Sequence, residues 1–175
     1  MLFRSLAVGI VLSLLDTDYS HGGPVPFSFQ YRGLYRTTPN PGGYVKLTHT
    51  SHGLLEDSYA VAPLRVAAYR GSVTGELPLT AAAYVPTLAA RFAGFRLEGE
   101  GKTRISSSLQ GYEVLYTARV AGREMWGRDV MLLPGGAGVR EGVVVEMLSR
   151  EPATISLPVA SSGLLETPLK SFAFG

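Results

Sequence analysis

Three runs of alternating apolar and polar residues, joined by tight turns, fill the stretch from Thr103 to Leu148. Side chains point to opposite faces at successive strand positions, so alternation gives a strand one buried face. In the first run, mostly polar residues separate the members of the buried face, which are Tyr112, Val114, Tyr116, Ala118 and Val120. Ala121-Gly122 then predicts a two-residue hairpin turn, because glycine tolerates the positive φ that such turns need.

The second and third runs extend this pattern into a meander. The second covers Glu124 to Leu133 and ends at a proline- and glycine-rich segment, Pro134 to Gly138. Proline lacks the donor for a strand ladder, and glycine has a low strand preference. Three consecutive valines, Val143 to Val145, form the apolar centre of the third run. The whole stretch therefore predicts three antiparallel strands on which the other segments pack.

Length and charge exclude several classes of protein. The chain has 175 residues and a formal net charge of +2. A single domain of this length buries roughly two-thirds of the surface of its unfolded chain. Lysine and arginine are not clustered in one segment, which argues against nucleic-acid binding. Cysteine is absent, so disulfides, thiolate metal sites, a cysteine nucleophile and a cysteine-linked lipid anchor are excluded.

The first 15 residues predict the cellular location of the protein. A single charge, Arg4, precedes an uncharged run from Ser5 to Leu15. This order matches a secretory signal or a short membrane anchor, since a full span needs about 20 apolar residues. A buried N-terminal helix of the domain is the alternative. Because the positive charge comes first, we expect a secreted or membrane-anchored domain that lies outside the cytoplasm.

The remaining segments predict how the meander is covered. Residues 16–26 are polar and then rich in glycine and proline, which indicates a linker to a single domain over residues 27–175. Alternating runs at 27–32 and 44–50 predict a hairpin with a long loop, and 59–69 predicts a further strand. Residues 51–58 and the charged segment 96–103 are expected to be connections.

Helical spacing occurs between these strands. Val85, Leu88, Ala89 and Phe92 fall on one face of a helix that ends near Gly94 and begins near, or is kinked by, Pro86. A short helix is expected within residues 163–175. Helices that pack on an antiparallel sheet of about six strands give an α+β layered fold.

Five segments carry a resemblance to a known group of domains. They are FSFQYRGLYRT (27–37), APLRVAAY (62–69), LAARFAGF (88–95), LQGYEVLYTARV (109–120) and SFAF (171–174). In this order they resemble the Mog1/PsbP-like group, which includes many bacterial exported or lipid-anchored domains. The chain departs from the group where Tyr31-Arg32-Gly33 and Tyr35 replace the common Tyr-Pro and Trp, and where Pro168 interrupts the last helix. The resemblance implies a helix-covered sheet and a non-enzymatic accessory or binding role, with partners as different as a small GTPase and a photosystem.

Few residues are candidates for chemistry. His49 and His52 could bind zinc together with Glu56 or Asp57, although solvated loop histidines are the simpler interpretation. The G-x-S-x-G elbow is absent, and the GEGK segment lacks the spacing of a phosphate-binding loop. A glycosidase-like carboxylate pair would come from Glu98, Glu100, Glu113, Glu124, Asp129, Glu141 and Glu146. Several of these lie at loop or outward-facing strand positions, where a solvated charge is the usual state. We therefore predict no catalytic, cofactor-binding or metal-binding residues, and no enzymatic activity.

The sole tryptophan gives the one candidate for an interaction surface. Trp126 lies in the middle run, and Trp and Arg side chains are enriched at binding hot spots. Together with Arg123 and Arg128 it forms the predicted surface, and a core tryptophan with an ion-paired outer face is the alternative. We expect an accessory domain that binds a protein partner, such as a subunit of an assembly held at the membrane by the N-terminal segment. A carrier of a small apolar ligand between sheet and helices, and an enzyme with an unrecognised site, are the other hypotheses.

Overall fold

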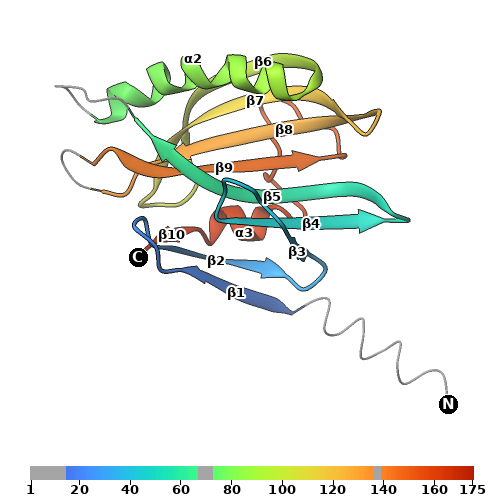
Figure 1. Ribbon diagram of the computed structural model, residues 1–175, viewed down its shortest axis with the longest axis horizontal. Coiled ribbons are helices and arrows are strands. Elements are labelled where there is room, and N and C mark those ends of the chain that lie inside the picture. Colours follow the sequence, from blue (N-terminus) through green and yellow to red (C-terminus); the bar gives the residue numbers. More distant parts are fainter. Residues whose placement is uncertain (1–14, 67–72, 136–138) are drawn as a thin grey trace.

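The computed structural model describes residues 15–66, 73–135 and 139–175 of the chain (Figure 1). Except for Leu15, the predicted signal or membrane anchor lies outside these residues. Within the described ranges, no helix is both long enough and apolar enough to cross a membrane.

Two antiparallel sheets and two helices build the described part of the chain. The large sheet contains, in spatial order, β3 (Arg36–Thr38), β4 (Val45–Ser51), β5 (Leu54–Arg65), β9 (Glu141–Ser149), β8 (Arg123–Leu132), β7 (Gln110–Val120) and β6 (Ala93–Arg104). The small sheet places β2 (Phe27–Arg32) between β1 (Asp16–His21) and β10 (Ala173–Phe174). Helix α2 (Val73–Arg91) covers one face of the large sheet, and the small sheet and α3 (Glu166–Lys170) lie on the other (Figure 1). The predicted α+β architecture is confirmed.

The predicted meander is confirmed as β7, β8 and β9, which are neighbours in the large sheet. Ala121 and Gly122 form the turn between β7 and β8, with φ angles of 51° and 78°. Because both values are positive, the turn has the twist that suits a two-residue hairpin. On β7, the residues Val114, Tyr116 and Ala118 pack beneath α2, as the alternation predicts.

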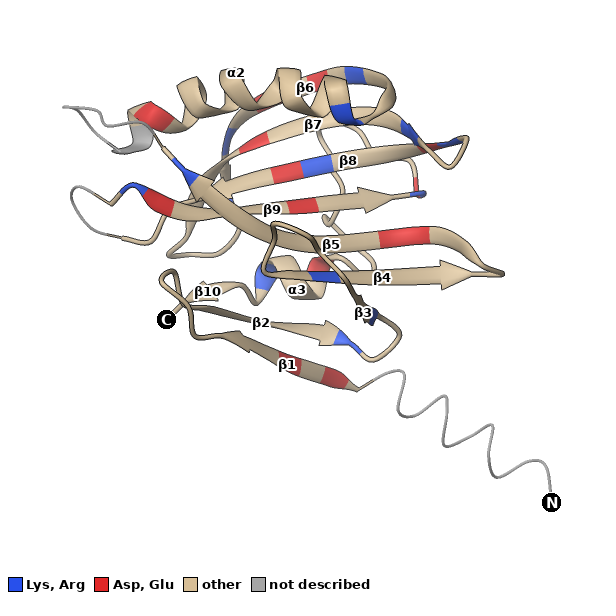
Figure 2. Ribbon diagram, in the orientation of Figure 1, with Lys and Arg blue, Asp and Glu red and all other residues tan. Residues whose placement is uncertain are grey.

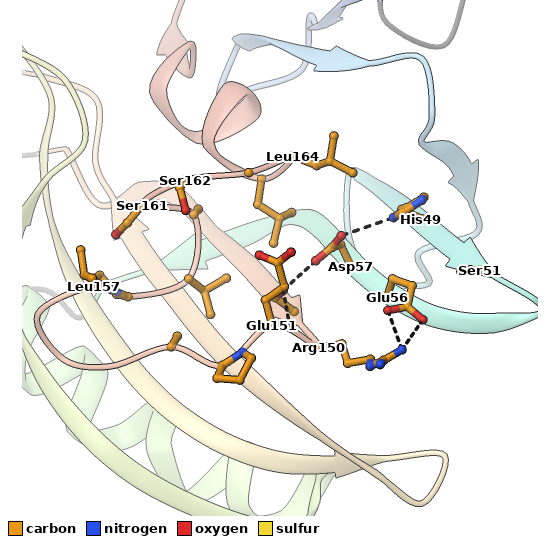
Figure 3. A pocket seen from close by; sticks show the side chains of 18 residues that line it. His49, Ser51, Glu56, Asp57, Arg150, Glu151, Leu157, Ser161, Ser162 and Leu164 are labelled. Atoms are coloured by element: carbon orange, nitrogen blue, oxygen red, sulfur yellow. Dashed lines mark hydrogen bonds and ion pairs between the residues drawn. The ribbon is translucent and has the colours of Figure 1, made fainter. Parts of the chain in front are cut away.

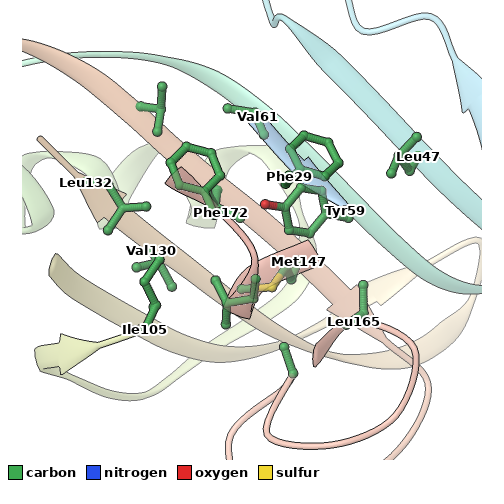
Figure 4. Close-up of a cluster of buried hydrophobic side chains, with 14 of the residues drawn as sticks. Phe29, Leu47, Tyr59, Val61, Ile105, Val130, Leu132, Met147, Leu165 and Phe172 are labelled. Carbon is green, nitrogen blue, oxygen red and sulfur yellow. The ribbon is translucent and has the colours of Figure 1, made fainter. Parts of the chain in front are cut away.

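Apolar side chains fill the space on both faces of the large sheet. The larger cluster lies between the two sheets, where Phe29 packs against Tyr59 with ring centroids 4.9 Å apart (Figure 4). The other cluster lies between α2 and the sheet and includes Leu77, Ala81 and Leu88 of the helix. Burial of both faces explains the consecutive apolar residues at 130–132 of β8 and 143–145 of β9.

The prediction of a linker over residues 16–26 is wrong for its first half. Residues 16–21 form β1, which pairs with β2 along its whole length, from Asp16 opposite Arg32 to His21 opposite Phe27. Only Tyr19 and His21 of β1 are half-buried, and Tyr19 stacks on Phe29 with centroids 5.0 Å apart. A mostly polar segment can therefore be a strand, because its outward residues face water.

The predicted pairing of residues 27–32 with 44–50 is also wrong. These strands, β2 and β4, belong to different sheets, and β4 pairs with β3 and β5 instead. The segment 51–58 is not a loop, since His52 and Gly53 form a tight turn and β5 begins at Leu54. Residues 96–103 are likewise part of a strand, the exposed edge strand β6.

Helix α2 is longer than predicted, and Val85, Leu88 and Phe92 of the predicted face pack against the sheet. It contains both Pro78 and Pro86. Leu88 is buried as expected, but Ala89 is exposed. Tyr84 turns toward the sheet instead and reaches carboxylates of β8 and β9. The apolar pattern therefore predicts the covered face of the helix, but not the polar contact that Tyr84 makes there.

Replacing Gly127 with alanine should lower the free energy of unfolding by about 1–3 kcal/mol, measured by urea denaturation. Gly127 lies directly opposite Tyr116, whose ring covers it, and an added Cβ would overlap the ring carbon Cζ. The matched control is Gly101→Ala on β6, where an added Cβ meets nothing within 4 Å. Equal stability of the two variants would contradict this packing.

Candidate functional site

A pocket of about 540 Å³ opens between the large sheet and the loop of residues 150–165 (Figure 3). Its sheet side presents polar side chains from three neighbouring strands, namely His49 of β4, Asp57 of β5 and Ser149 of β9. Its loop side presents Glu151 and apolar residues that include Leu157 and Val159. A mixed lining of this kind suits a peptide segment better than a purely apolar ligand.

Asp57 is the centre of the polar chain in this pocket. Its carboxylate accepts a 2.7 Å hydrogen bond from Oγ of Ser149, and Nδ1 of His49 lies 3.3 Å away. Ser149 Oγ in turn accepts a 3.1 Å bond from the backbone N–H of Glu151. In a catalytic triad the serine contacts the histidine, which takes its proton. Here both side chains bind the aspartate, so the arrangement joins the loop to the sheet without activating the serine.

Arginine–glutamate pairs border the same pocket. Glu56 accepts bonds of 3.0 and 3.2 Å from Nη1 of Arg150, and Nη2 of Arg123 lies 3.6 Å from it. Arg123 also donates to the backbone carbonyl of Leu55 at 3.3 Å. These contacts fix the turn between β7 and β8 next to β5.

A second pocket, of about 140 Å³, lies on the other side of the same loop. Trp126 and Leu115 contribute to it from the sheet, and Ile155 contributes from the loop. The two pockets share one wall, formed by Ala153, Pro158 and Val159. Ile155 and Leu157 project from this shared loop with 66% and 69% of their surface exposed.

The predicted interaction residues do not form one surface. Trp126 is half-buried and lines the second pocket, whereas Arg123 is held by Glu56 near the first. Arg128 is only 6% exposed and lies inside the protein, where it binds Glu113. Contact of Trp126 or Arg123 with a partner stays a prediction.

The two neighbouring histidines do not converge. Nδ1 of His49 faces Asp57, and Nδ1 of His52 lies 3.0 Å from the hydroxyl of Ser51 in the turn between β4 and β5. In the described part of the chain, no group of three or more histidine, aspartate and glutamate side chains is arranged to hold a metal ion.

A polar network beneath α2 was missed by the sequence prediction. Asp129 is 0% exposed, so it is not one of the solvated carboxylates. It lies directly across from Glu146 of β9, and Tyr84 of α2 and Tyr116 of β7 both contact it. Burial and the nearby Glu146 carboxylate raise the pKa of Asp129 to about 8. Strand alternation in the sequence could have predicted this burial, because it puts Asp129 on the same face of β8 as the buried Met131.

Known structures identify the fold. No family model matches the sequence, and no curated protein matches it. The structure is similar to LpqN, which is involved in cell envelope biogenesis of Mycobacterium tuberculosis, with a TM-score of 0.56 and 10% identity over 91% of each chain. It is also similar to the Ran-binding protein Mog1p of Saccharomyces cerevisiae, with a TM-score of 0.55 and 9% identity over 92% of this chain and 96% of that one. The chain therefore has a Mog1/PsbP-like fold, as its sequence segments predict.

Proposed function

We propose that the chain is a non-enzymatic accessory domain that acts outside the cytoplasm and binds a segment of a partner protein along the loop of residues 150–165. The observation that carries this proposal is the pair of pockets with one common wall. An extended segment that crosses this wall would enter both pockets and bury the exposed side chains of Ile155 and Leu157.

The position of the exposed apolar residues supports this site. Single exposed leucines are ordinary on protein surfaces. Ile155 and Leu157, however, are two residues apart on one loop, and each lines a pocket. Apolar side chains beside a pocket, with polar groups around them, are typical of the centre of a binding interface.

The chemistry of the pocket favours binding over catalysis. Ser149 donates its proton to Asp57, so no imidazole is placed to remove it. The carrier hypothesis places a ligand between α2 and the sheet, where Tyr84, Phe92 and Tyr116 occupy the space. Both pockets lie beside the loop of residues 150–165, on the face of the large sheet opposite α2.

The similar structures support, in general terms, a protein partner and a location in the cell envelope. Mog1p binds Ran, and LpqN is involved in cell envelope biogenesis. The apolar N-terminus with its preceding Arg4 agrees with export. At about 10% identity, these structures suggest the type of role and do not identify the partner.

A photo-crosslinking amino acid in place of Leu157 should capture one discrete protein in cells of the source organism. The matched control carries the same amino acid in place of Thr17, an exposed residue of the outer strand β1. We expect an adduct from position 157 that is absent from position 17, with the partner peptide identified by mass spectrometry.

Two results would overturn the proposal. The first is an absence of adducts at position 157, or the same adducts from both positions. The second is turnover by the purified chain in a broad hydrolase screen that is lost in Ser149→Ala, since this would make the pocket catalytic.

A further inference from the structure

Strand β6 is an open edge of the large sheet. It pairs with β7 on one side and with no other strand of the described chain. Its side chains from Arg96 to Arg104 are exposed or half-exposed. The unpaired N–H and C=O groups of an edge strand form a template for another strand.

The charged side chains of β6 form a fixed pattern along this edge: Arg96 is positive, Glu98 and Glu100 are negative, and Lys102 and Arg104 are positive. Glu100 and Lys102 lie opposite Val114 and Tyr112 of β7, so both project on the face that α2 covers. Within the described chain, Lys102 and Arg104 form no ion pair, whereas Glu98 already binds Arg96. The edge therefore has unpaired positive charges next to a negative one.

We propose that two copies of the chain pair antiparallel through β6, with Gly101 of each copy opposite Gly101 of the other. In this register Glu100 faces Lys102, and the two-fold symmetry makes that pair twice. A shift of the partner by two residues puts Glu100 opposite Glu100 in one direction, or Lys102 opposite Lys102 in the other. Glu98 also faces Arg104 in the proposed register, whereas each shifted register opposes at least one pair of like charges. Directly opposed like charges destabilise strand pairs and opposite charges stabilise them, so the charges favour the proposed register over both shifts.

The surface of α2 supports the same arrangement independently. From Val73 to Arg91 its charged residues are Glu76 and Arg91, near the two ends (Figure 2). Between them the exposed side carries no charge and is mostly small and apolar, with Leu79, Ala82, Ala83, Pro86, Ala89 and Ala90 beside one polar residue, Thr87. A helix that faces only water normally carries charged and polar residues on its outer side.

Pairing through β6 would give this apolar side a partner. Helix α2 packs over β6 and β7, at the open edge of the sheet. The two-fold axis is perpendicular to the joined sheet, so both copies of α2 lie on the same face, one on each side of the axis. Small side chains allow the helices to approach closely. The edge charges and the uncharged helix surface thus point to the same occupant, a second copy of this chain.

A disulfide at Gly101 tests the register. The chain has no cysteine, and a side chain at Gly101 meets nothing within 4 Å, so Gly101→Cys adds one thiol without disturbing the strand. Under mild oxidation we expect a covalent dimer, because residues opposite each other on antiparallel strands lie within disulfide range. Gly99→Cys is the matched control. It faces Thr103 of the partner in this register, so its own thiols are about four residues apart along the strands and cannot join.

A charge exchange tests the ion pairs. Glu100→Lys and Lys102→Glu should each weaken the dimer at least roughly tenfold in sedimentation equilibrium, because each places like charges opposite one another twice. The double variant Glu100→Lys/Lys102→Glu restores the opposite charges and should restore the dimer. The inference is overturned if the native chain is monomeric at all concentrations, if Gly99→Cys crosslinks as efficiently as Gly101→Cys, or if the double variant fails to dimerise although circular dichroism shows it folded.

Discussion

Replacing Arg128 with alanine should lower the free energy of unfolding by about 3–5 kcal/mol, measured by urea denaturation at neutral pH. The Arg128 guanidinium is buried, and its Nε and Nη2 lie 2.9 and 2.8 Å from Oε2 of Glu113. It also donates to the carbonyl of Val159 at 2.9 Å and to the hydroxyl of Thr103 at 3.2 Å. Alanine would leave a largely buried carboxylate and a buried carbonyl without these donors.

The matched control is Arg150→Ala, which removes an exposed arginine paired with Glu56. We expect a change of about 0–1 kcal/mol there, since an exposed ion pair is weak. Because Val159 is part of the wall shared by the pockets, Arg128→Ala should also increase hydrogen exchange in the loop of residues 150–165. If Arg128→Ala is as stable as Arg150→Ala, Arg128 is not an anchor of the loop.

Most strands could be predicted because their evidence is local. The alternation from Tyr112 to Val120, and the turn residues that follow it, lie in one continuous stretch. The sheet to which a strand belongs depends on distant contacts. Phe27 of β2 stacks on Phe172 with centroids 5.4 Å apart, and Phe29 packs on Tyr59. Nothing in the segment 27–32 itself indicates these contacts, which is why its pairing with residues 44–50 was a wrong prediction.

The candidate site was less predictable for the same reason. His49 and Asp57 are near each other in the sequence, but Ser149 comes 92 residues after Asp57. The pocket forms only when β4, β5 and β9 are neighbours and the loop after β9 folds back over them. Pro152 and Pro158 are typical of a loop, but nothing in the segment itself indicates that it separates two pockets.

Hydrogen-bond geometry determines which side chain holds a proton in the polar network beneath α2. Oη of Tyr84 lies 2.8 Å from Oδ2 of Asp129 and 2.8 Å from Oε1 of Glu146. A phenol has one proton, yet two short oxygen–oxygen contacts need two. Arg91 donates to Oε1 of Glu146 at 2.8 Å, which favours a charged glutamate. The second proton therefore belongs to Asp129, which donates to Tyr84 while Tyr84 donates to Glu146.

A proton held in this way makes stability depend on pH. Burial first, and the Glu146 carboxylate second, raise the pKa of Asp129 from an ordinary value of 3.8 to about 8. At pH values between these two pKa values, Asp129 keeps a proton in the folded chain that it has lost in the unfolded chain. The free energy of unfolding contributed by this group therefore falls as the pH rises, by up to about 1.4 kcal/mol per pH unit, and levels off above pH 8. Below the unfolded pKa the group has no such effect.

Asp129→Asn should remove this slope, because asparagine is neutral, has the same shape and can still donate to Tyr84. We expect the stability of Asp129→Asn relative to the native chain to increase from pH 5 to pH 8, measured by urea denaturation at each pH. The control Asp18→Asn, on the exposed strand β1, removes a carboxylate without altering the network. Parallel curves for the native chain and Asp129→Asn would show that Asp129 is ionised in the folded protein. In that case Tyr84 would bind only one of the two carboxylates at a time, and the docking of α2 would not be linked to a proton.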